Sequence, residues 1–182
     1  MSGLCDGMRV LEVATGSGEM FRSLARANCS GFTLGVDLAP KMAARTQRTV
    51  RQELPSCRAY CQAVDARQMP FRNETFDSVF CCYLLELLPA DDIPVALGEL
   101  WRVLRREGHL TLVLVSRNAV LFNLVYRVLG KMAPALWGRQ VEQKFADLVE
   151  AAHFRVSHHR MVRQTFYPSD VLVARKSLGA GP

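Results

Sequence analysis

The amino-terminal part of the chain joins an apolar segment to a glycine turn, and a second apolar segment ends in an acid. Residues 8–13 run into a turn over 14–18, which contains Gly16 and Gly18, and the second segment ends at Asp37. Small residues let the backbone approach a ligand closely, and a following helix points its free N–H groups at the same place. The 21 residues from Gly16 to Asp37 suit a turn, a helix and a return strand. The pattern therefore predicts a parallel strand–helix–strand unit with a nucleoside-binding half-site at one sheet edge.

Strand-like apolar runs alternate with helical patterns along the whole chain, which predicts a mostly parallel α/β sheet. The strands are expected over 8–13, 32–37, 58–64, 76–83, 109–115, 154–163 and 170–175. The helices are expected over 18–28, 40–54, 91–105, roughly 118–133, and 140–152. The last two strands are separated by only a few residues around 165–168, too few for a helical crossover, so they should pair as a hairpin. We expect one domain over 1–182 with a Rossmann-like seven-stranded sheet, a reversed last strand, helices on both faces and a short helical insert after strand five.

Two ligand classes use such a half-site, dinucleotides and S-adenosylmethionine (SAM). The dinucleotide pattern Gly-x-Gly-x-x-Gly has its third glycine where this chain has Phe21. Glu12 precedes the loop, where a carboxylate suits the amino group of a methionine moiety better than a diphosphate. The expected terminal hairpin favours SAM more strongly than the glycine loop does, because the standard dinucleotide fold has six parallel strands.

Five segments, taken together, resemble the motifs of the class I SAM-dependent methyltransferases. They are residues 11–18, 35–42, 65–71, 76–79 and 100–110, in this order and spacing. One departure is Ala14, which stands where the family usually has its first glycine. The resemblance covers roughly residues 8 to 115 and implies that the protein is an enzyme with SAM as its cofactor.

The resemblance also implies roles for particular residues. Glu12, Gly16 and Gly18 would hold the methionine part of SAM, Asp37 the ribose hydroxyls, and Asp65 with Ala66 the adenine amino group. The expected cofactor-binding residues are Glu12, Ala14, Gly16, Gly18, Asp37, Leu38, Met42, Asp65, Ala66 and Cys82. Each has a structural alternative: the glycines as plain turn residues, Asp37 as a helix N-cap before Pro40, and Asp65 as a loop cap. Methyl transfer from a sulfonium needs no metal, so we expect no metal site, and the resemblance identifies no catalytic residue.

The acceptor side of the site is expected after strands four and five. The candidate substrate-pocket residues are Tyr83, Glu86, Tyr126 and Tyr167. Glu86 could act as a base or hold a cationic substrate, and a helix-capping or ion-paired carboxylate is an equal alternative. The segment 117–139 has apolar residues at helical spacing, so it could cover a lipophilic acceptor, rest on a bilayer through 118–138, or pack as an ordinary core helix.

In the segment 117–139 the chain is most similar to the methyltransferases that act on quinones and other small lipophilic molecules. That branch usually has several dozen residues before the first strand, and this chain has about seven. The sequence leaves four explanations of this difference. The pocket is unusually open, the insert alone covers it, a second subunit helps to cover it, or the start of the chain is missing. The predicted function is methyl transfer to a small, lipophilic acceptor, quinol-like or lipid. The alternatives are a non-catalytic methyltransferase-like partner subunit and, disfavoured by Phe21 and the absence of a Tyr-x-x-x-Lys pair, a nicotinamide-dependent reductase.

Charge and cysteine content bear on partners and compartment. The net charge is +6, but the basic residues are scattered and form no run of five, so a nucleic-acid partner is not expected. No signal-like segment opens the sequence, and we expect a cytoplasmic protein, peripheral to a membrane if 118–138 contacts one. The six cysteines are expected as small, buried hydrophobic residues in a reducing compartment, because Cys81 and Cys82 are adjacent in a strand and Cys57 and Cys61 lack a second pair. The histidines are expected away from the site, and the oligomeric state is left open.

Overall fold

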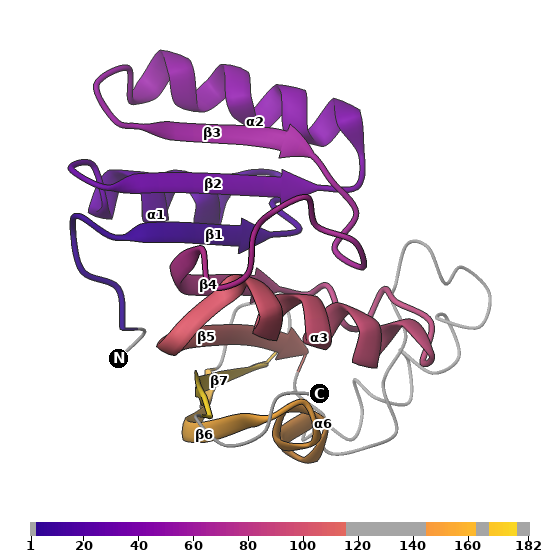
Figure 1. Cartoon of the computed structure of the whole chain (residues 1–182). Coiled ribbons are helices and arrows are strands. Elements are labelled where there is room, and N and C mark those ends of the chain that lie inside the picture. Colours follow the sequence, from indigo (N-terminus) through magenta and orange to yellow (C-terminus); the bar gives the residue numbers. More distant parts are fainter. Residues whose placement is uncertain (1–2, 116–144, 163–167, 178–182) are drawn as a thin grey trace.

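The computed structural model describes residues 3–115, 145–162 and 168–177 (Figure 1). Its sheet has seven strands in the order β3-β2-β1-β4-β5-β7-β6. The strands are β1 Arg9–Val13, β2 Phe32–Asp37, β3 Ala59–Ala63, β4 Phe76–Cys82, β5 Leu104–Val115, β6 Phe154–Val162 and β7 Ser169–Lys176. The helices are α1 Glu19–Ala27, α2 Pro40–Glu53, α3 Asp92–Val103 and α6 Phe145–Ala151.

The strand directions confirm the predicted topology. Strands β1 to β5 pair in parallel, whereas β7 pairs antiparallel with both of its neighbours, β5 and β6. The short connection between β6 and β7 could not hold a crossover helix, and the two strands form the expected antiparallel pair. This arrangement brings the carboxyl ends of β1, β2 and β4 to one edge of the sheet, together with the start of β7.

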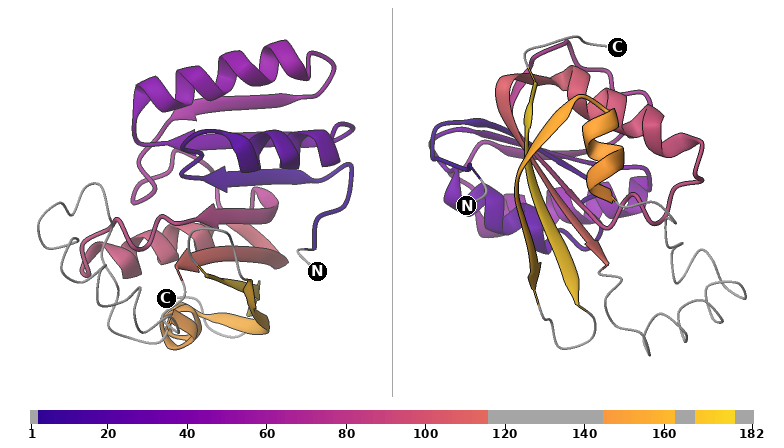
Figure 2. Two further views of the ribbon diagram at one scale, coloured as in Figure 1. Left: turned by 180° about the vertical axis from the view of Figure 1, so that it is seen from behind. Right: turned by 90° about the horizontal axis from the view of Figure 1, so that it is seen from below.

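Helices cover both faces of the sheet, as Figure 2 shows. On one face, α1 and α2 bury Phe21, Ala25 and Val50 in a common cluster. On the other face, α3 and α6 join the main core, which includes Leu100 of α3 and Val149 of α6. The alternation of side chains along each strand explains this division, since successive residues point to opposite faces.

The start of β5 differs from the prediction. The sequence placed residues 104 and 105 in the preceding helix, but α3 ends at Val103 and Leu104 already pairs with Phe76 of β4. The pairing is then interrupted by a register shift before His109 pairs with Ser78. Val103 and Leu104 are both fully buried, and an extended chain can bury both where a continuing helix would turn one of them away.

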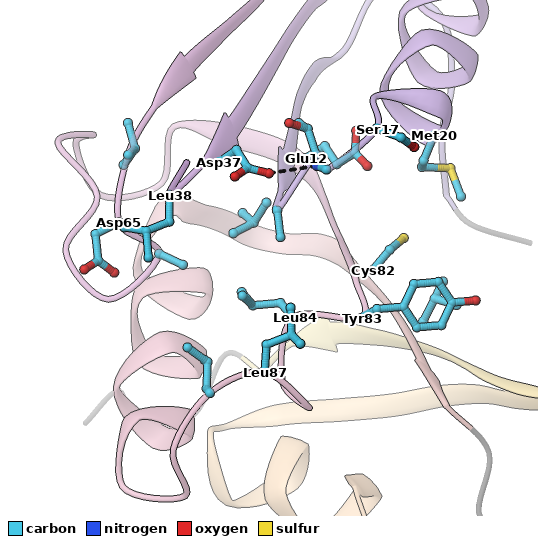
Figure 3. Close-up of a pocket in the computed structure, with 18 of the residues that line it drawn as sticks. Glu12, Ser17, Met20, Asp37, Leu38, Asp65, Cys82, Tyr83, Leu84 and Leu87 are labelled. Carbon is cyan, nitrogen blue, oxygen red and sulfur yellow. Dashed lines mark hydrogen bonds between the residues drawn. The ribbon is translucent and has the colours of Figure 1, made fainter. Parts of the chain in front are cut away.

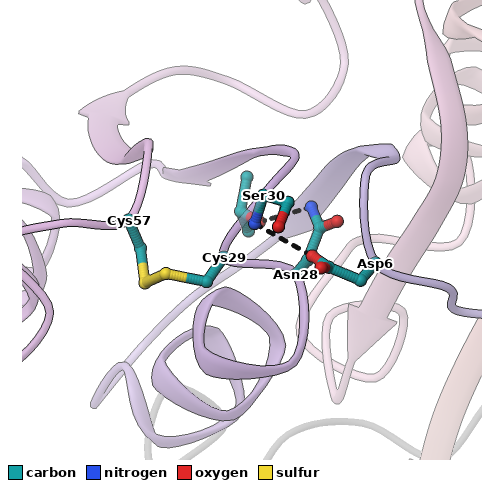
Figure 4. Close-up of a disulfide and its surroundings, with 6 residues drawn as sticks. Asp6, Asn28, Cys29, Ser30 and Cys57 are labelled. Atoms are coloured by element: carbon teal, nitrogen blue, oxygen red, sulfur yellow. Dashed lines mark hydrogen bonds between the residues drawn. A yellow bond between two sulfur atoms is a disulfide. The ribbon is translucent and has the colours of Figure 1, made fainter.

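The cysteine prediction was wrong for two residues. Cys29 and Cys57 form a disulfide, with their Cα atoms 4.5 Å apart (Figure 4). Cys29 lies in the turn before β2 and Cys57 in the turn before β3, and these strands are parallel neighbours. Two turns that lead into neighbouring parallel strands meet at the same sheet edge, which the spacing of cysteines along the chain did not indicate. Cys61 and Cys81 are free and buried, as expected, whereas Cys5 is free but exposed, which also differs from the prediction.

The last two predicted helices are described only in part. The expected helix over 118–133 lies outside the described residues, and α6 covers part of the helix expected over 140–152. No helix in the described part of the chain is long and apolar enough to cross a membrane.

Candidate cofactor and substrate pocket

A pocket of about 1040 Å³ opens at the carboxyl ends of the parallel strands (Figure 3). Nine of the predicted site residues line it: Glu12, Ala14, Gly16, Asp37, Leu38, Asp65, Ala66, Cys82 and Tyr83. They lie at the ends of β1, β2 and β4 and in the loops that follow β1 to β4, and the parallel sheet brings these segments together at one edge.

The loop after β1 is held against β2. The backbone N–H groups of Ala14 and Thr15 both donate to the carbonyl of Val36, at 2.8 and 3.1 Å. Ala14 and Gly16 both have left-handed backbone torsions, with φ of 65° and 51°. A Cβ built on Gly16 would meet nothing within 4 Å, so this glycine leaves open space beside the backbone.

Asp37 connects two of the loops. Its Oδ2 accepts the N–H of Gly16 at 2.7 Å, and its Oδ1 accepts the N–H of Ala39 at 2.9 Å. The N-cap residue of α2 is Ala39, whose own side chain makes no capping hydrogen bond. Asp37 is therefore not the N-cap residue itself, although its carboxylate binds the backbone N–H of that residue. The carboxylate instead fixes the glycine loop relative to the end of β2, and it remains part of the pocket wall.

Glu12 places a buried carboxylate at the pocket. The residue is 1% exposed, and its Oε2 has no hydrogen-bond partner among the described residues. Burial, and secondly the nearby charge of Asp37, raise the pKa of Glu12 well above its ordinary value. An ionised, unpartnered carboxylate is costly in such a place, and a cation in the pocket would offset that cost.

The loop after β3 carries an ion-pair network at the pocket mouth. Arg67 contacts Asp65 at 2.7 Å and Asp92 at 2.8 Å, and the Asp65 carboxylate also accepts the N–H of Arg67. The hydrogen bonds from Arg67 lower the pKa of Asp65. Asp65 is therefore ionised and bound to a neighbouring side chain that the sequence analysis did not include in the site.

The turn after β4 forms the apolar half of the pocket. Tyr83 has a left-handed backbone, with φ of 56°, donates its N–H to Val113 at 2.8 Å, and shares a 2.8 Å hydrogen bond between its hydroxyl and Ser169 Oγ. These contacts tie the turn to β5 and to the start of β7. The apolar side chains that line this half are Leu84, Leu87, Leu88, Val113, Val162 and Val171.

Cys82 lies between the two halves. Burial, and secondly the carboxylates of Glu12 and Glu86, raise the pKa of this thiol to about 12. The thiol is thus neutral at physiological pH and does not supply a thiolate nucleophile.

Three predicted residues do not line the pocket. Glu86 is 3% exposed and turned into the protein, where its Oε1 accepts the N–H of Val115 at 2.6 Å. Among the described residues it neither caps a helix nor forms an ion pair, the two alternative roles that the sequence suggested. Gly18 is the N-cap residue of α1, and its missing Cβ makes room for Thr46 of α2. Met42 is exposed on α2.

Two predicted residues cannot be placed, and several residues that line the pocket were not predicted. Tyr126 and Tyr167 lie outside the described residues. Among the lining residues that sequence reasoning missed, Ser17 and Arg67 are direct neighbours of predicted ones and could have been found by extending each motif. Val162 and Val171 had no local signal, because only the strand order brings β6 and β7 to this pocket.

Comparison with known proteins identifies the class. A family model described as a methyltransferase domain matches residues 10–108, and the chain belongs to this family. Demethylmenaquinone methyltransferase from Roseiflexus castenholzii is 34% identical over 110 residues, which are 60% of this chain and 43% of that protein. Phosphatidylethanolamine N-methyltransferase from Cereibacter sphaeroides is 32% identical over 107 residues, 59% of this chain and 50% of that protein. The chain thus spans about half the length of these curated relatives.

Solved structures agree on the fold. A SAM-dependent methyltransferase from Methanosarcina mazei superposes with a TM-score of 0.80 at 17% identity, covering 97% of this chain and 95% of that one. The chain therefore belongs to the class I SAM-dependent methyltransferases, and it is similar in sequence to demethylmenaquinone methyltransferases.

Proposed function

We propose that this protein transfers a methyl group from SAM to a small lipophilic acceptor, quinol-like or lipid. One observation carries the proposal: a single pocket combines a buried carboxylate at Glu12, whose Oε2 has no hydrogen-bond partner in the described part of the chain, with an apolar wall built by Leu84, Leu87 and Val171. The polar half suits a charged cofactor, and the apolar half suits an acceptor with little polar surface.

The residues of the polar half fit SAM. Glu12 Oε2 is a hydrogen-bond acceptor that carries negative charge when ionised and has no partner among the described residues, and the amino group of the methionine part requires such an acceptor. The open space at Gly16 would let the backbone lie close to this part of the ligand. Asp37 would hold the ribose hydroxyls, and Asp65 with Ala66 the adenine. When bound, SAM supplies a methyl group on a cationic sulfur that is already activated for displacement.

The remaining protein groups contribute alignment and exclusion of water. Holding two reactants in line is worth about 7–11 kcal/mol in well-oriented cases. Leu84 and Val113 would keep water from the reacting atoms, and this favours a reaction in which a cationic electrophile loses charge. The hydroxyl of Tyr83 is hydrogen-bonded to Ser169, and this bond holds the turn after β4 in place.

The names of two relatives support a lipophilic acceptor. One relative methylates demethylmenaquinone and another phosphatidylethanolamine, as their names state. Within this proposal, 1–182 form a single methyltransferase domain, Tyr126 and Tyr167 belong to the acceptor side, and 118–138 provides a peripheral membrane contact.

Titration calorimetry with SAM tests the cofactor half. Asp37→Ala should abolish binding, since it removes the carboxylate proposed for the ribose and the acceptor for the Gly16 N–H. Asp77→Ala is the matched control, because Asp77 also accepts a backbone N–H, that of Arg9 at 2.6 Å, but does so at the opposite sheet edge. Unchanged SAM affinity in Asp37→Ala would overturn the assignment.

Mass spectrometry tests the acceptor half. The protein is incubated with methyl-labelled SAM and either lipid extracts or polar metabolite extracts, and label should enter the lipid fraction. Leu87→Asp should reduce that labelling and leave SAM affinity intact, because Leu87 is 57% exposed and its substitution disturbs no core contact. Label confined to the polar fraction would contradict a lipophilic acceptor.

A further inference from the structure

A second hollow lies on the sheet at the opposite end of β5 from the SAM pocket. It has a volume of about 350 Å³. The residues that line it are His109, Arg155, Val156, Ser157, His158, Val173 and Arg175. Four of these seven side chains are basic or become cationic on protonation, and none is acidic.

Strand register places three of the basic residues in one row. His109 of β5 pairs with Arg175 of β7, and Arg175 pairs with Arg155 of β6. Paired residues on neighbouring strands point to the same face of a sheet, so the three side chains lie beside one another. Thr111, two residues after His109, pairs with Phe80, which packs against Leu24 of α1. The row is therefore on the face that carries α1.

The row is poorly compensated by acidic groups. Arg175 has Glu107 at 3.8 Å, and both side chains are 47% exposed, so this ion pair contributes little. Within the described part of the chain, neither Arg155 nor His158 has a carboxylate at ion-pair distance. Like charges placed opposite one another on neighbouring strands destabilise a sheet, and a bound anion would relieve this repulsion.

Edge protection does not account for the whole row. Exposed edge strands often carry charges that prevent pairing with another chain, which would explain Arg155 and His158 on β6. His109 and Arg175 are on β5 and β7, which are interior strands. Burial, and secondly the charges of Arg175 and Arg105, lower the pKa of His109, which agrees with a positive potential at this place.

We propose that this hollow binds an anionic group of the phosphate type, with Arg155 and Arg175 as its charged donors and His109 and His158 as further donors. Arginine forks match the geometry of phosphate oxygens, and charge-assisted hydrogen bonds are the stronger kind. The proposal does not depend on the proposed function, because binding can be measured without SAM and without methyl transfer.

The anion has two conceivable sources, a free phosphate ester or the head group of an amphiphile. The same sheet face leads from the hollow to the SAM pocket, whose wall includes Val171, four residues before Arg175 on β7. Four strand residues span about 13 Å. An alkyl chain could follow this face from the basic row toward the apolar half of the pocket.

Calorimetry with inorganic phosphate at constant ionic strength tests the site. Arg155→Gln and Arg175→Gln should each weaken phosphate binding about tenfold, since each removes a charged hydrogen-bond donor. Arg160→Gln is the matched control, because Arg160 is on the same strand and face but does not line the hollow. Equal weakening in the control, or no phosphate binding by the wild type, overturns the proposal.

A second titration distinguishes the sources, with circular dichroism confirming that each variant is folded. Dodecyl phosphate is compared with inorganic phosphate, and both should lose affinity in Arg155→Gln and Arg175→Gln. Binding of dodecyl phosphate that is tighter than that of inorganic phosphate, with a difference that shrinks in the uncharged variant Val173→Thr, identifies an amphiphile, and equal binding of the two identifies a free phosphate ester. If neither arginine substitution weakens the binding of dodecyl phosphate, the proposed site is wrong.

Discussion

Glu86 accepts the backbone N–H of Val115 at 2.6 Å, which joins the turn after β4 to the last residue of β5. Its second oxygen, Oε2, is buried without a partner among the described residues. Burial raises the pKa of Glu86 to about 6, although the hydrogen bond from Val115 lowers it in part. This buried carboxylate positions the apolar wall of the pocket, because Leu84 and Leu87 belong to the same turn.

The first prediction concerns the effect of Glu86 on stability as a function of pH. Its pKa is about 6 in the folded protein against 4.5 for an ordinary glutamate, so the folded state binds the proton more tightly. The unfolding free energy therefore falls as the pH rises from about 4.5 through 6, by about 2 kcal/mol. Glu86→Gln stays neutral and should avoid this fall. Urea unfolding at pH 4.5 and 7.5 should show the variant gaining about 2 kcal/mol over the wild type at the higher pH.

Comparing variant with wild type at each pH isolates this effect, since Glu12 has a raised pKa as well and contributes equally to both proteins. SAM affinity should be unchanged, because Glu86 does not line the pocket. A stability difference that does not vary with pH would show that Glu86 titrates normally in the folded protein.

The second prediction sets stability against binding at Glu12. The pKa of the buried Glu12 carboxyl is raised well above normal, so its ionisation at neutral pH costs folding free energy. Glu12→Gln cannot ionise, and the variant should therefore be more stable than the wild type at neutral pH. The same change should weaken SAM binding by about tenfold to a hundredfold, through loss of a hydrogen bond to a charged group. Calorimetry and thermal unfolding measure both effects. If the variant loses stability and keeps its affinity, Glu12 is not the ligand's partner.

The pH dependence of SAM affinity gives an independent check. A ligand ammonium needs Glu12 ionised, so wild-type affinity should rise with pH until the pH exceeds the raised pKa of the free protein. Glu12→Gln should lose this dependence.

The sequence predicted the sheet well because the signals are local. Apolar runs, the glycine turn and the short connection before β7 each act within a few residues, and seven strands follow from them. The pocket residues that follow β1, β2 and β3 could be predicted for the same reason, since each comes directly after the end of a strand.

The sequence predicted side-chain environments less well because these depend on contacts between distant segments. Glu86 follows a strand just as Tyr83 does, but its carboxylate accepts the backbone N–H of Val115, which lies on another strand. Arg67 binds both Asp65 and Asp92, which are 27 residues apart in the chain. Cys29 and Cys57 meet only because β2 and β3 are neighbours. No local pattern contains this information.

The third prediction separates two glycines of one loop. Gly16→Ala meets no atom within 4 Å, so the fold should tolerate it apart from about 1–2 kcal/mol for its left-handed backbone. The added methyl group would occupy space proposed for SAM, and calorimetry should show binding lost. Gly18→Ala would approach Thr46 Oγ1 to 2.6 Å and should lower the thermal midpoint more than Gly16→Ala. Similar SAM affinity in Gly16→Ala and the wild type would show that the ligand does not lie against this loop.

The last prediction concerns the disulfide. Cys29 and Cys57 are 28 residues apart, and closing a loop of this length stabilises a protein by about 3.5 kcal/mol through the entropy of the unfolded chain. Cys57→Ser should therefore lower the thermal midpoint, and a reducing agent should lower that of the wild type to the same value. Cys5→Ser is the control, because Cys5 is free and exposed. SAM affinity should be retained in every case, since the disulfide joins turns at the sheet edge opposite the pocket. A wild-type midpoint that a reductant leaves unchanged would show that the bond does not form in solution.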